Sequence, residues 1–426
     1  MKNFLYLCLL LLLVTPLKAA DYYWIGGTGD WSDISNWATT SGGFLTHNQA
    51  PTADDNVYFD ANSFTGPGQT VTLNGTFAFC RDMIWQAGTQ NAVFTAAANA
   101  TLNVFGSFQL STEMDFDFQG DVVFQGANTG SSIGLAGQQF NQNVVFDGVG
   151  ASWQFESDVV VDSLFIFYNG QLNSGSFSIV SERFYSDITS NGSNLNLENS
   201  VFTFSGIDLE SFRQNPNTLF MGGNVPNAYS LDLATYVFNG SQTTVVFDYF
   251  QQIELGTIRF LSETGKSVIS SFSGEIGVFT ALEFQNNTSI EMGLETDSLI
   301  LGGGKNFDFA AGQEYAIGFL DVQGNCQEPV FIQSANSGEP VFFVDAGNGL
   351  NLVYTTLRDI QTRGPGSFIA DNSVDLGNNI GWIINVKSYA ELYWVGGSGM
   401  WDDSDHWSFT SGGPGGACIP TPGEDV

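Results

Sequence analysis

Basic side chains and histidine are scarce in this 426-residue chain, which has 11 lysines and arginines, 44 aspartates and glutamates, and two histidines. The formal net charge is −33 at pH 7. A polyanion of this size repels nucleic acid and anionic lipid, so nucleic-acid binding is excluded as a function. A lyase for acidic polysaccharides is also disfavoured, because it would need basic groups to neutralise a substrate carboxylate.

The usual signatures of catalysis are missing as well. The chain has no His-Glu-x-x-His, no Gly-x-Ser-x-Gly and no Cys-His pair. Its two histidines, His47 and His406, do not align with each other when the two halves of the chain are compared. Paired carboxylates for glycoside hydrolysis would be hidden among 44 acids. We therefore predict a protein without enzymatic activity, and polysaccharide cleavage is the alternative.

Only one long apolar run is present, from Phe4 to Val14. It follows Lys2 and precedes the small pair Ala19-Ala20, the pattern of a secretory signal peptide over residues 1–20. A transmembrane helix needs about 20 apolar residues. The sequence thus predicts a protein secreted to the medium or the outer cell surface, without a transmembrane segment.

Cysteine is rare, and only Cys80, Cys326 and Cys418 remain once the signal peptide is removed. An odd number cannot pair completely within one chain. One hypothesis pairs Cys418 with a cysteine beyond residue 426 and leaves Cys80 without its partner. The alternative is that all three are buried, unpaired thiols.

What the chain does contain is a duplicated cassette rich in tryptophan and glycine. Residues 23–43 and 393–413 align without a gap, with 12 of 21 positions identical. Pro420-Thr421 then corresponds to Pro51-Thr52. The repeat indicates a modular chain, with residues 392–426 as the truncated start of a second module.

Between the cassettes the chain has short apolar runs punctuated by turn residues, a pattern typical of an all-β protein. Five of these runs end in a glycine, and the glycines recur at a nearly constant interval: Gly106, Gly126, Gly148, Gly170 and Gly192. A constant interval favours a right-handed parallel β-helix, a β-solenoid in which each coil adds one strand to the same sheet. Tandem β-sandwiches are the alternative, since the interval is lost over residues 210–320.

The expected organisation has five parts. Residues 1–20 are the signal peptide, 21–69 the cassette and N-terminal cap, 70–384 the solenoid, 385–391 a linker and 392–426 the second cassette. Solenoid ends need a cap, because the first coil has no neighbour to cover its apolar face.

Six tryptophans are the candidate ligand or cap residues: Trp24, Trp31, Trp37, Trp394, Trp401 and Trp407. They could stack on sugars or cover the end of the solenoid, and the second role is favoured. Calcium is the one cofactor considered, because aspartates gather near the first cassette, although no known calcium-binding spacing is present: Asp30, Asp33, Asp54, Asp55 and Asp60. Such aspartates are more often turn residues.

Both cassettes and the closing segment that ends in Gly381-Trp382 resemble parts of large modular surface proteins of Bacteroidetes-type bacteria. Asn36-Trp37 followed by Pro51 is similar to the opening of autotransporter-like β-helical passenger domains. The resemblance implies export through the type IX system and an adhesive role at the cell surface.

Together these observations predict a secreted, acidic, adhesin-like β-helix that presents polar loops, with an extracellular glycan or surface protein as partner. The alternative is a carbohydrate-binding or polysaccharide-degrading β-helix.

Overall fold

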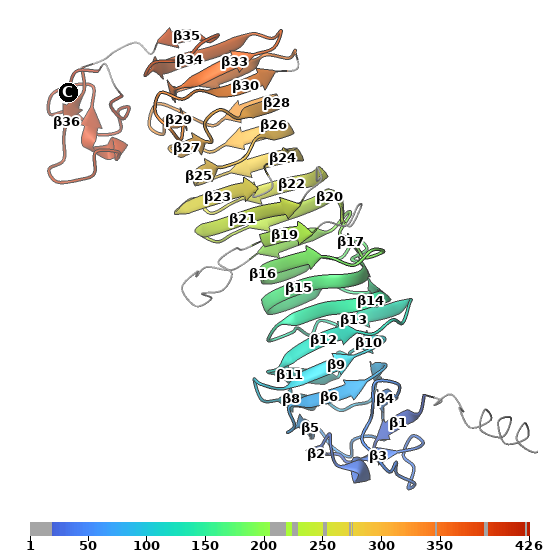
Figure 1. Cartoon of the computed structure of the whole chain (residues 1–426). Helices are drawn as coiled ribbons and strands as arrows, with labels where there is room; N and C mark the ends of the chain where they lie inside the picture. The colour runs from blue at the N-terminus through green and yellow to red at the C-terminus, as the bar shows by residue number, and fades with distance from the viewer. Residues whose placement is uncertain are drawn as a thin grey trace, which may run out of the picture. The chain divides into compact units, whose positions relative to one another are not determined.

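The computed structural model describes residues 19–204, 219–223, 229–249, 254–271, 274, 276–345, 347–386, 391–421 and 424–426. The predicted signal peptide therefore lies outside the described residues, except for Ala19 and Ala20. The described chain is all-β and forms a parallel β-solenoid of about 13 turns (Figure 1). This confirms the predicted fold class over the tandem-sandwich alternative.

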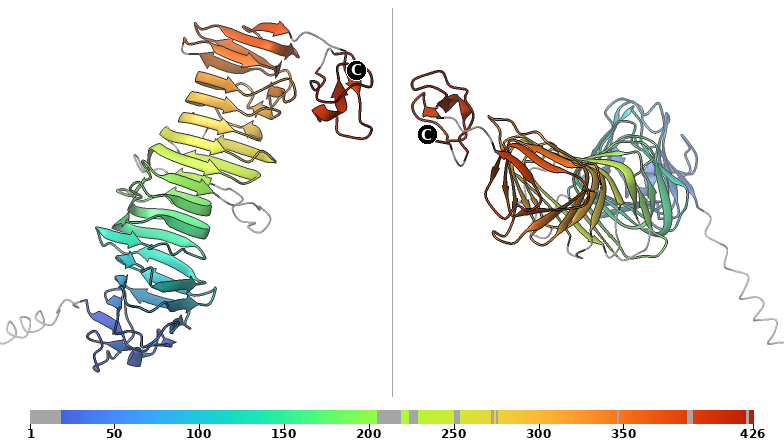
Figure 2. Two further views of the ribbon diagram at one scale, coloured as in Figure 1. Left: turned by 180° about the vertical axis from the view of Figure 1, so that it is seen from behind. Right: turned by 90° about the horizontal axis from the view of Figure 1, so that it is seen from above.

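Contacts divide the chain into two compact units. The first comprises Met1–Phe177 with Gly192–Leu195, and the second comprises Ser178–Asn191 with Asn196–Val426. Both are built from stacked coils, and a coil is seen end-on in Figure 2.

Each coil of the first unit contributes strands to three parallel ladders. The first ladder is β1 (Asp21–Trp24), β4 (Asn56–Phe59), β7 (Met83–Trp85), β10 (Phe108–Gln109) and β13 (Ser131–Gly134). The second is β6 (Phe77–Cys80), β9 (Thr101–Val104), β12 (Asp121–Gln125), β14 (Val144–Phe155) and β15 (Val159–Asn173). The third is β2 (Gly29–Asp30), β5 (Thr70–Leu73), β8 (Ala92–Ala96) and β11 (Met114–Phe118). β3 (Trp37–Ala38) pairs antiparallel with β1, and the 3-10 helix η1 (Ile34–Asn36) precedes it.

Alternation of side chains explains why these segments are strands. In β8, the residues that point inward are buried and those between them are half-buried, as expected for a strand with one face in the core.

The predicted glycine interval follows the coils of the first unit. Val104, Phe124, Phe146 and Phe167 are direct partners in neighbouring strands, so successive coils here have nearly the same length. Gly148 and Gly170 do not end strands as the pattern predicted, because they lie inside β14 and β15. Gly170 has a φ of 109°, and a Cβ there would meet the Trp153 ring at 2.5 Å. A side chain at position 170 is excluded by both the left-handed backbone and the lack of space.

The strands of the second unit are β16 (Ile179–Ile188), β18 (Val201–Phe204), β19 (Leu219–Gly223), β20 (Tyr229–Phe238), β21 (Gln242–Tyr249), β22 (Glu254–Phe260), β23 (Lys266–Ser271), β24 (Gly277–Phe284), β25 (Asn287–Ile290), β26 (Leu294–Leu301), β27 (Asn306–Phe309), β28 (Glu314–Val322), β29 (Val330–Ser334), β30 (Val341–Asp345), β31 (Leu350–Val353), β32 (Thr355–Arg358), β33 (Ile360–Arg363), β34 (Phe368–Asp375) and β35 (Ile383–Val386). In the second unit most strands from β18 to β30 pair in parallel with the strand two places along the chain, whereas β29, β30 and β31 pair with the strand three places along. β17 (Asn194–Asn196) lies where the sequence passes from the first unit to the second.

A column of inward residues shows the register from Phe238 to Val322, in the region where the sequence interval was lost. Direct partners in this column are Phe238, Phe260, Phe284, Leu301 and Val322, and their separations along the sequence differ from turn to turn. Stacked rings from Phe204 to Phe284 have centroids 4.5, 4.9 and 4.8 Å apart, which is the separation of neighbouring strands. The coils thus differ in length in their loops, while the column of inward residues stays aligned.

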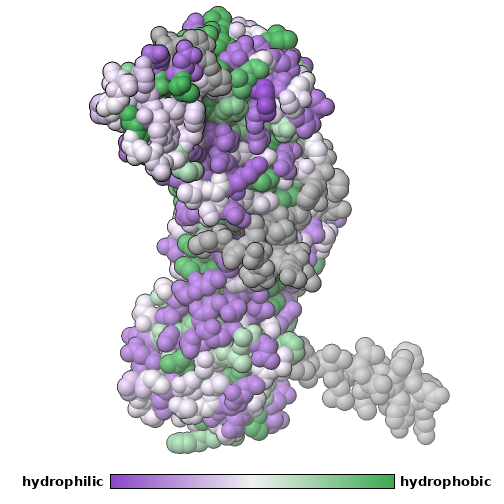
Figure 3. All heavy atoms as spheres, turned by 90° about the vertical axis from the view of Figure 1, so that its left-hand side faces the viewer, coloured by the Kyte–Doolittle hydropathy of each residue, from purple (hydrophilic) through white to green (hydrophobic). Residues whose placement is uncertain are grey.

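The second cassette folds as β36 (Tyr393–Trp394), η2 (Ser404–His406) and β37 (Trp407–Ser408). It follows β35 after a predicted linker whose residues 387–390 lie outside the described part. The face shown in Figure 3 is largely hydrophilic or neutral, with hydrophobic residues scattered among them.

Candidate functional site

The first cassette is held together by its own backbone. Tyr23 and Trp24 of β1 pair antiparallel with Ala38 and Trp37 of β3. The Trp37 indole Nε1 donates to the carbonyl of Trp31 at 2.8 Å, and the Trp24 indole Nε1 donates to the Gly27 carbonyl at 3.0 Å. Both indole N–H groups are therefore used inside the cassette, and neither is available to a ligand.

The three tryptophans of this cassette are buried. Trp37 meets Trp24 edge-on at 5.0 Å and Trp31 at 4.9 Å. Phe59 of β4 lies against all three rings, and Phe94 of β8 lies 5.9 Å from Trp31. Their exposed fractions are at most 3%, so no ring face is open to a sugar, and the cluster covers the first coils as a cap.

Four of the five aspartates near the first cassette accept hydrogen bonds within turns. Asp33 accepts from the backbone N–H of Ser35 and caps η1, and Asp55 accepts from the N–H groups of Ala20 and Thr52. Among the described residues, no three Asp, Glu, His or Cys side chains come together as metal ligands. The structure thus does not gather Asp30, Asp33, Asp54, Asp55 and Asp60 into a calcium site.

The charge state of Asp30 follows from its contacts. Partial burial acts to raise its pKa, but hydrogen bonds from Ser32 and from the Asn74 amide outweigh burial and lower it below the usual range. Asp33 also has a lowered pKa, because its carboxylate accepts the hydroxyl and the backbone N–H of Ser35. Both aspartates are therefore stabilised as anions by local hydrogen bonds.

The second cassette repeats this fold almost contact for contact. Tyr393 and Trp394 pair with Ser408 and Trp407. The Trp407 indole donates to the Trp401 carbonyl at 2.7 Å, and the rings of these two residues meet edge-on at 4.8 Å. The parallel bridge between Glu391 and Asp425 matches the pairing of Asp21 with Asn56 in the first cassette.

Exposure is what separates the two copies. Trp407 is 2% exposed, but Trp394 is 40% and Trp401 56% exposed. His406 stacks on Trp394 at 4.8 Å, in the place of Asn36, and no described aromatic ring takes the place of Phe59. The six candidate tryptophans thus divide into four buried and two exposed residues, and of the buried ones Trp24, Trp31 and Trp37 pack on the first coils while Trp407 is buried within its own cassette.

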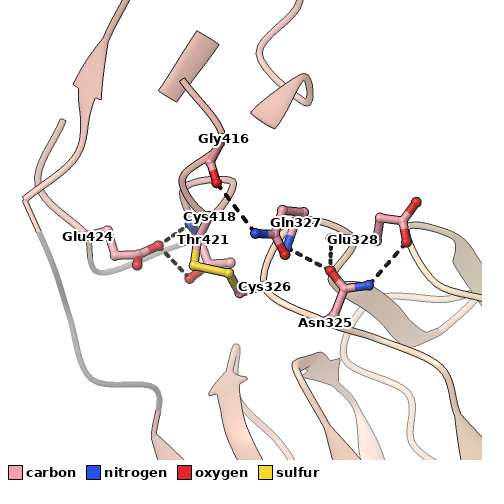
Figure 4. The surroundings of a disulfide bond; sticks show 8 residues. All are labelled: Asn325, Cys326, Gln327, Glu328, Gly416, Cys418, Thr421 and Glu424. Atoms are coloured by element: carbon pink, nitrogen blue, oxygen red, sulfur yellow. Dashed lines mark hydrogen bonds between the residues drawn. A yellow bond between two sulfur atoms is a disulfide. The ribbon is translucent and has the colours of Figure 1, made fainter. Parts of the chain in front are cut away.

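A disulfide joins the second cassette to the solenoid. Cys418 is bonded to Cys326, which lies in the loop after β28 (Figure 4). The Ile419 N–H donates to the Cys326 carbonyl at 3.0 Å, and the Gln327 side chain donates to the Gly416 carbonyl at 3.5 Å.

This bond corrects the cysteine hypotheses. The expectation that the partner of Cys418 lies beyond residue 426 is wrong, because Cys326 fills that role across 92 residues. The alternative of three unpaired thiols holds only for Cys80, which is free and buried. Spacing along the sequence could not reveal a pairing that a loop and a separate cassette create in space.

A cleft of about 410 Å³ lies beside the disulfide, between the start of β27 and the second cassette. Its polar walls include Lys305, Asn306 and Glu328 from the solenoid and Asp402 from the cassette. The Lys305 ammonium donates to the Glu263 carbonyl at 2.8 Å. The cleft is the size of a small-molecule site, and no motif or spacing in the sequence pointed to it.

Most basic side chains of the described chain are bound to acids. Ion pairs join Arg81 to Asp82, Arg259 to Glu283, Lys266 to Asp308, Arg358 to Asp359, and Arg363 to Glu314. These pairs are spread over many coils, and they leave little positive charge for an acidic substrate.

No family model, no curated protein and no solved structure matches the chain. None of the helices in the described residues is long and apolar enough to cross a membrane.

Proposed function

We propose that this chain is a non-catalytic, secreted surface module with an adhesive or structural role, in which a solenoid carries polar loops. The burial of Trp24, Trp31 and Trp37 beneath the first coils carries this proposal. These residues were the best ligand candidates in the first cassette, and their burial supports a role in the cap instead. Dispersed ion pairs and satisfied aspartates support the same view.

Adhesion is tested by coating beads with the full mature chain and measuring retention on host cells, on bacterial cells and on a glycan array, with and without calcium. Heat-unfolded protein on matched beads is the control. Saturable retention that the soluble chain competes away supports an adhesive role. Retention no better than the control on every surface contradicts adhesion.

The non-catalytic assignment has its own test. The chain is incubated with a panel of neutral and acidic polysaccharides, and new reducing ends and unsaturated products are measured. We expect no product above the boiled control, and cleavage of any polysaccharide contradicts the assignment.

A second candidate is carbohydrate binding in the cleft beside the disulfide, favoured by its volume of about 410 Å³ and its mixture of Lys305, Asn306, Glu328 and Asp402. A lining that holds both positive and negative groups suits a neutral, hydroxyl-rich ligand. Titration calorimetry with oligosaccharides selected on the glycan array tests it, and Asp402→Ala with Lys305→Ala should then abolish binding. Unchanged affinity in the double variant would exclude the cleft.

Secretion and surface display, with the type IX route implied by the resemblance, belong to the same proposal. N-terminal sequencing of the exported protein tests the signal peptide, with cleavage expected directly after Ala20.

A further inference from the structure

The two cassettes share a fold but differ in what covers them. In the first cassette, Phe59 and Phe94 cover Trp24 and Trp31, which are 0% and 3% exposed. The corresponding Trp394 and Trp401 are 40% and 56% exposed. Burial of a large aromatic ring is a main source of stabilisation. The exposed pair Trp394 and Trp401 is therefore an apolar surface, and the first cassette shows how the same surface is covered by aromatic side chains of the following strands.

Backbone groups show the same difference. The Trp31 N–H donates to the Thr72 carbonyl at 2.9 Å, and the Gly27 N–H donates to the Ser63 carbonyl at 3.2 Å. The corresponding N–H groups of Trp401 and Gly397 have no backbone acceptor within the described part of the chain. Unpaired N–H groups beside exposed apolar rings are the features of a strand edge that is ready to be extended.

The entry of a covering strand is already in place. Asn56 follows the Thr52–Asp55 turn and pairs with Asp21, and Phe59 ends the same strand. In the second cassette the equivalent turn is closed by Thr421 and Glu424, and Asp425 pairs with Glu391. Val426 therefore occupies the position of Val57, shortly before the place of Phe59.

We propose that Trp394, Trp401 and the backbone of residues 397–401 form an acceptor face for the first coil of a β-solenoid, entering as a strand that continues in register from Val426. The coil would place an aromatic side chain where Phe59 lies and a parallel strand beside Gly399 and Met400, as β5 lies beside Gly29 and Asp30. This goes beyond the proposed adhesive role and does not depend on it.

The test appends a copy of residues 58–386 directly after Val426 and measures hydroxyl-radical oxidation of each tryptophan by mass spectrometry. In the original chain, Trp394 and Trp401 should oxidise several-fold faster than Trp24 and Trp31, which serve as internal standards. In the extended chain, both should slow to the rates of those standards. The matched control carries Phe59→Asp and Phe94→Asp in the appended copy only, and it should leave Trp394 and Trp401 reactive.

Folding of the appended copy is measured separately, from its resistance to protease and its added β-sheet circular dichroism. A second fusion replaces residues 391–426 by residues 21–57, so that the first cassette stands at the same junction. A folded extension with Trp394 and Trp401 still reactive overturns the proposal. So does an extension that folds only on the transplanted first cassette.

Failure of both fusions to fold also overturns it, because no cassette at this junction would then receive a coil. Protection of Trp394 and Trp401 in the original chain by an oligosaccharide would identify the face as a ligand platform and overturn the proposal as well.

Discussion

Trp31 and Trp401 occupy the same position in two copies of one small fold, yet Trp31 is 3% exposed and Trp401 is 56% exposed. Truncation of a buried aromatic residue costs about 3–5 kcal/mol, whereas a change on the surface costs within about 0.5 kcal/mol. We expect Trp31→Ala to destabilise the first unit strongly and Trp401→Ala to leave stability nearly unchanged. Urea unfolding of the two full-length variants measures this, and equal losses would contradict the cap assignment.

The column of stacked phenylalanine rings from Phe204 to Phe284 gives a second pair of matched variants, one at a buried and one at an exposed phenylalanine. Phe260 is 1% exposed and stacks between Phe238 and Phe284, whereas Phe319 is 60% exposed. We expect Phe260→Ala to lower the free energy of unfolding of the second unit by about 3–5 kcal/mol, and Phe319→Ala to change it by less than about 0.5 kcal/mol. Urea unfolding, followed by far-ultraviolet circular dichroism, tests the pair. Similar effects from both variants would show that the ladder is not a packed core.

The disulfide should stabilise the closed loop of the second unit, because cross-linking restricts the unfolded chain. Cys418→Ser is expected to cost about 2–4 kcal/mol and to speed the release of the second cassette by protease. Limited proteolysis with and without reductant measures it. Reductant should reproduce the effect in the native chain and have none in the variant, and sensitivity to reductant in the variant would contradict the pairing with Cys326.

Cys80 should be chemically silent in the folded protein. Burial, and secondarily the negative charge of Asp82, raises the pKa of its thiol, and the thiolate is the reactive form. Iodoacetamide at pH 8 should leave Cys80 unmodified in the folded protein and should label it after denaturant is added. Reductant is omitted so that the Cys326–Cys418 disulfide stays closed. Mass spectrometry of the digested protein provides the measurement, and labelling of Cys80 in the native state would show that the first unit opens.

Asp30 should contribute to the acid limb of stability. Partial burial acts to raise its pKa, but hydrogen bonds from Ser32 and Asn74 outweigh burial, so the folded-state pKa lies below that of the unfolded chain. Its contribution is therefore complete above the unfolded pKa of about 4 and is lost as the pH falls through the folded value. Asp30→Asn should make unfolding less pH-dependent between neutral pH and pH 3. An unchanged acid limb would contradict this, and Asp54→Asn serves as the control.

The sequence predicted the coils wherever their length was constant. Gly126 directly follows β12, whereas Gly170 lies inside β15, yet both recur at a nearly fixed interval because Phe124, Phe146 and Phe167 occupy one ladder in neighbouring turns. Further along, the coil from Phe284 to Leu301 is shorter than the coil from Phe260 to Phe284. Loops absorb such changes without disturbing the inward column, so a search for a constant period loses the register there.

The candidate residues were harder to interpret than the fold. The tryptophans could be found from the repeat, but identical motifs gave no sign that Trp24 would be covered and Trp394 would not. Covering depends on Phe59 and Phe94, which lie outside the repeated residues. The bond between Cys326 and Cys418 and the cleft with Lys305 depend on how a loop meets the second cassette, which is a matter of tertiary contact.

The Cys326–Cys418 bond also sets the route of mechanical load through the chain. When tension is applied at Val426, it passes from Cys418 directly to Cys326, and the chain between these two residues, whose sequence separation is 92, is bypassed. Strands β29–β35, the predicted linker and the fold around Trp407 would carry no pulling force while the bond is intact. Under a pulling force, the disulfide would thus keep the junction between the solenoid and the second cassette from being stretched.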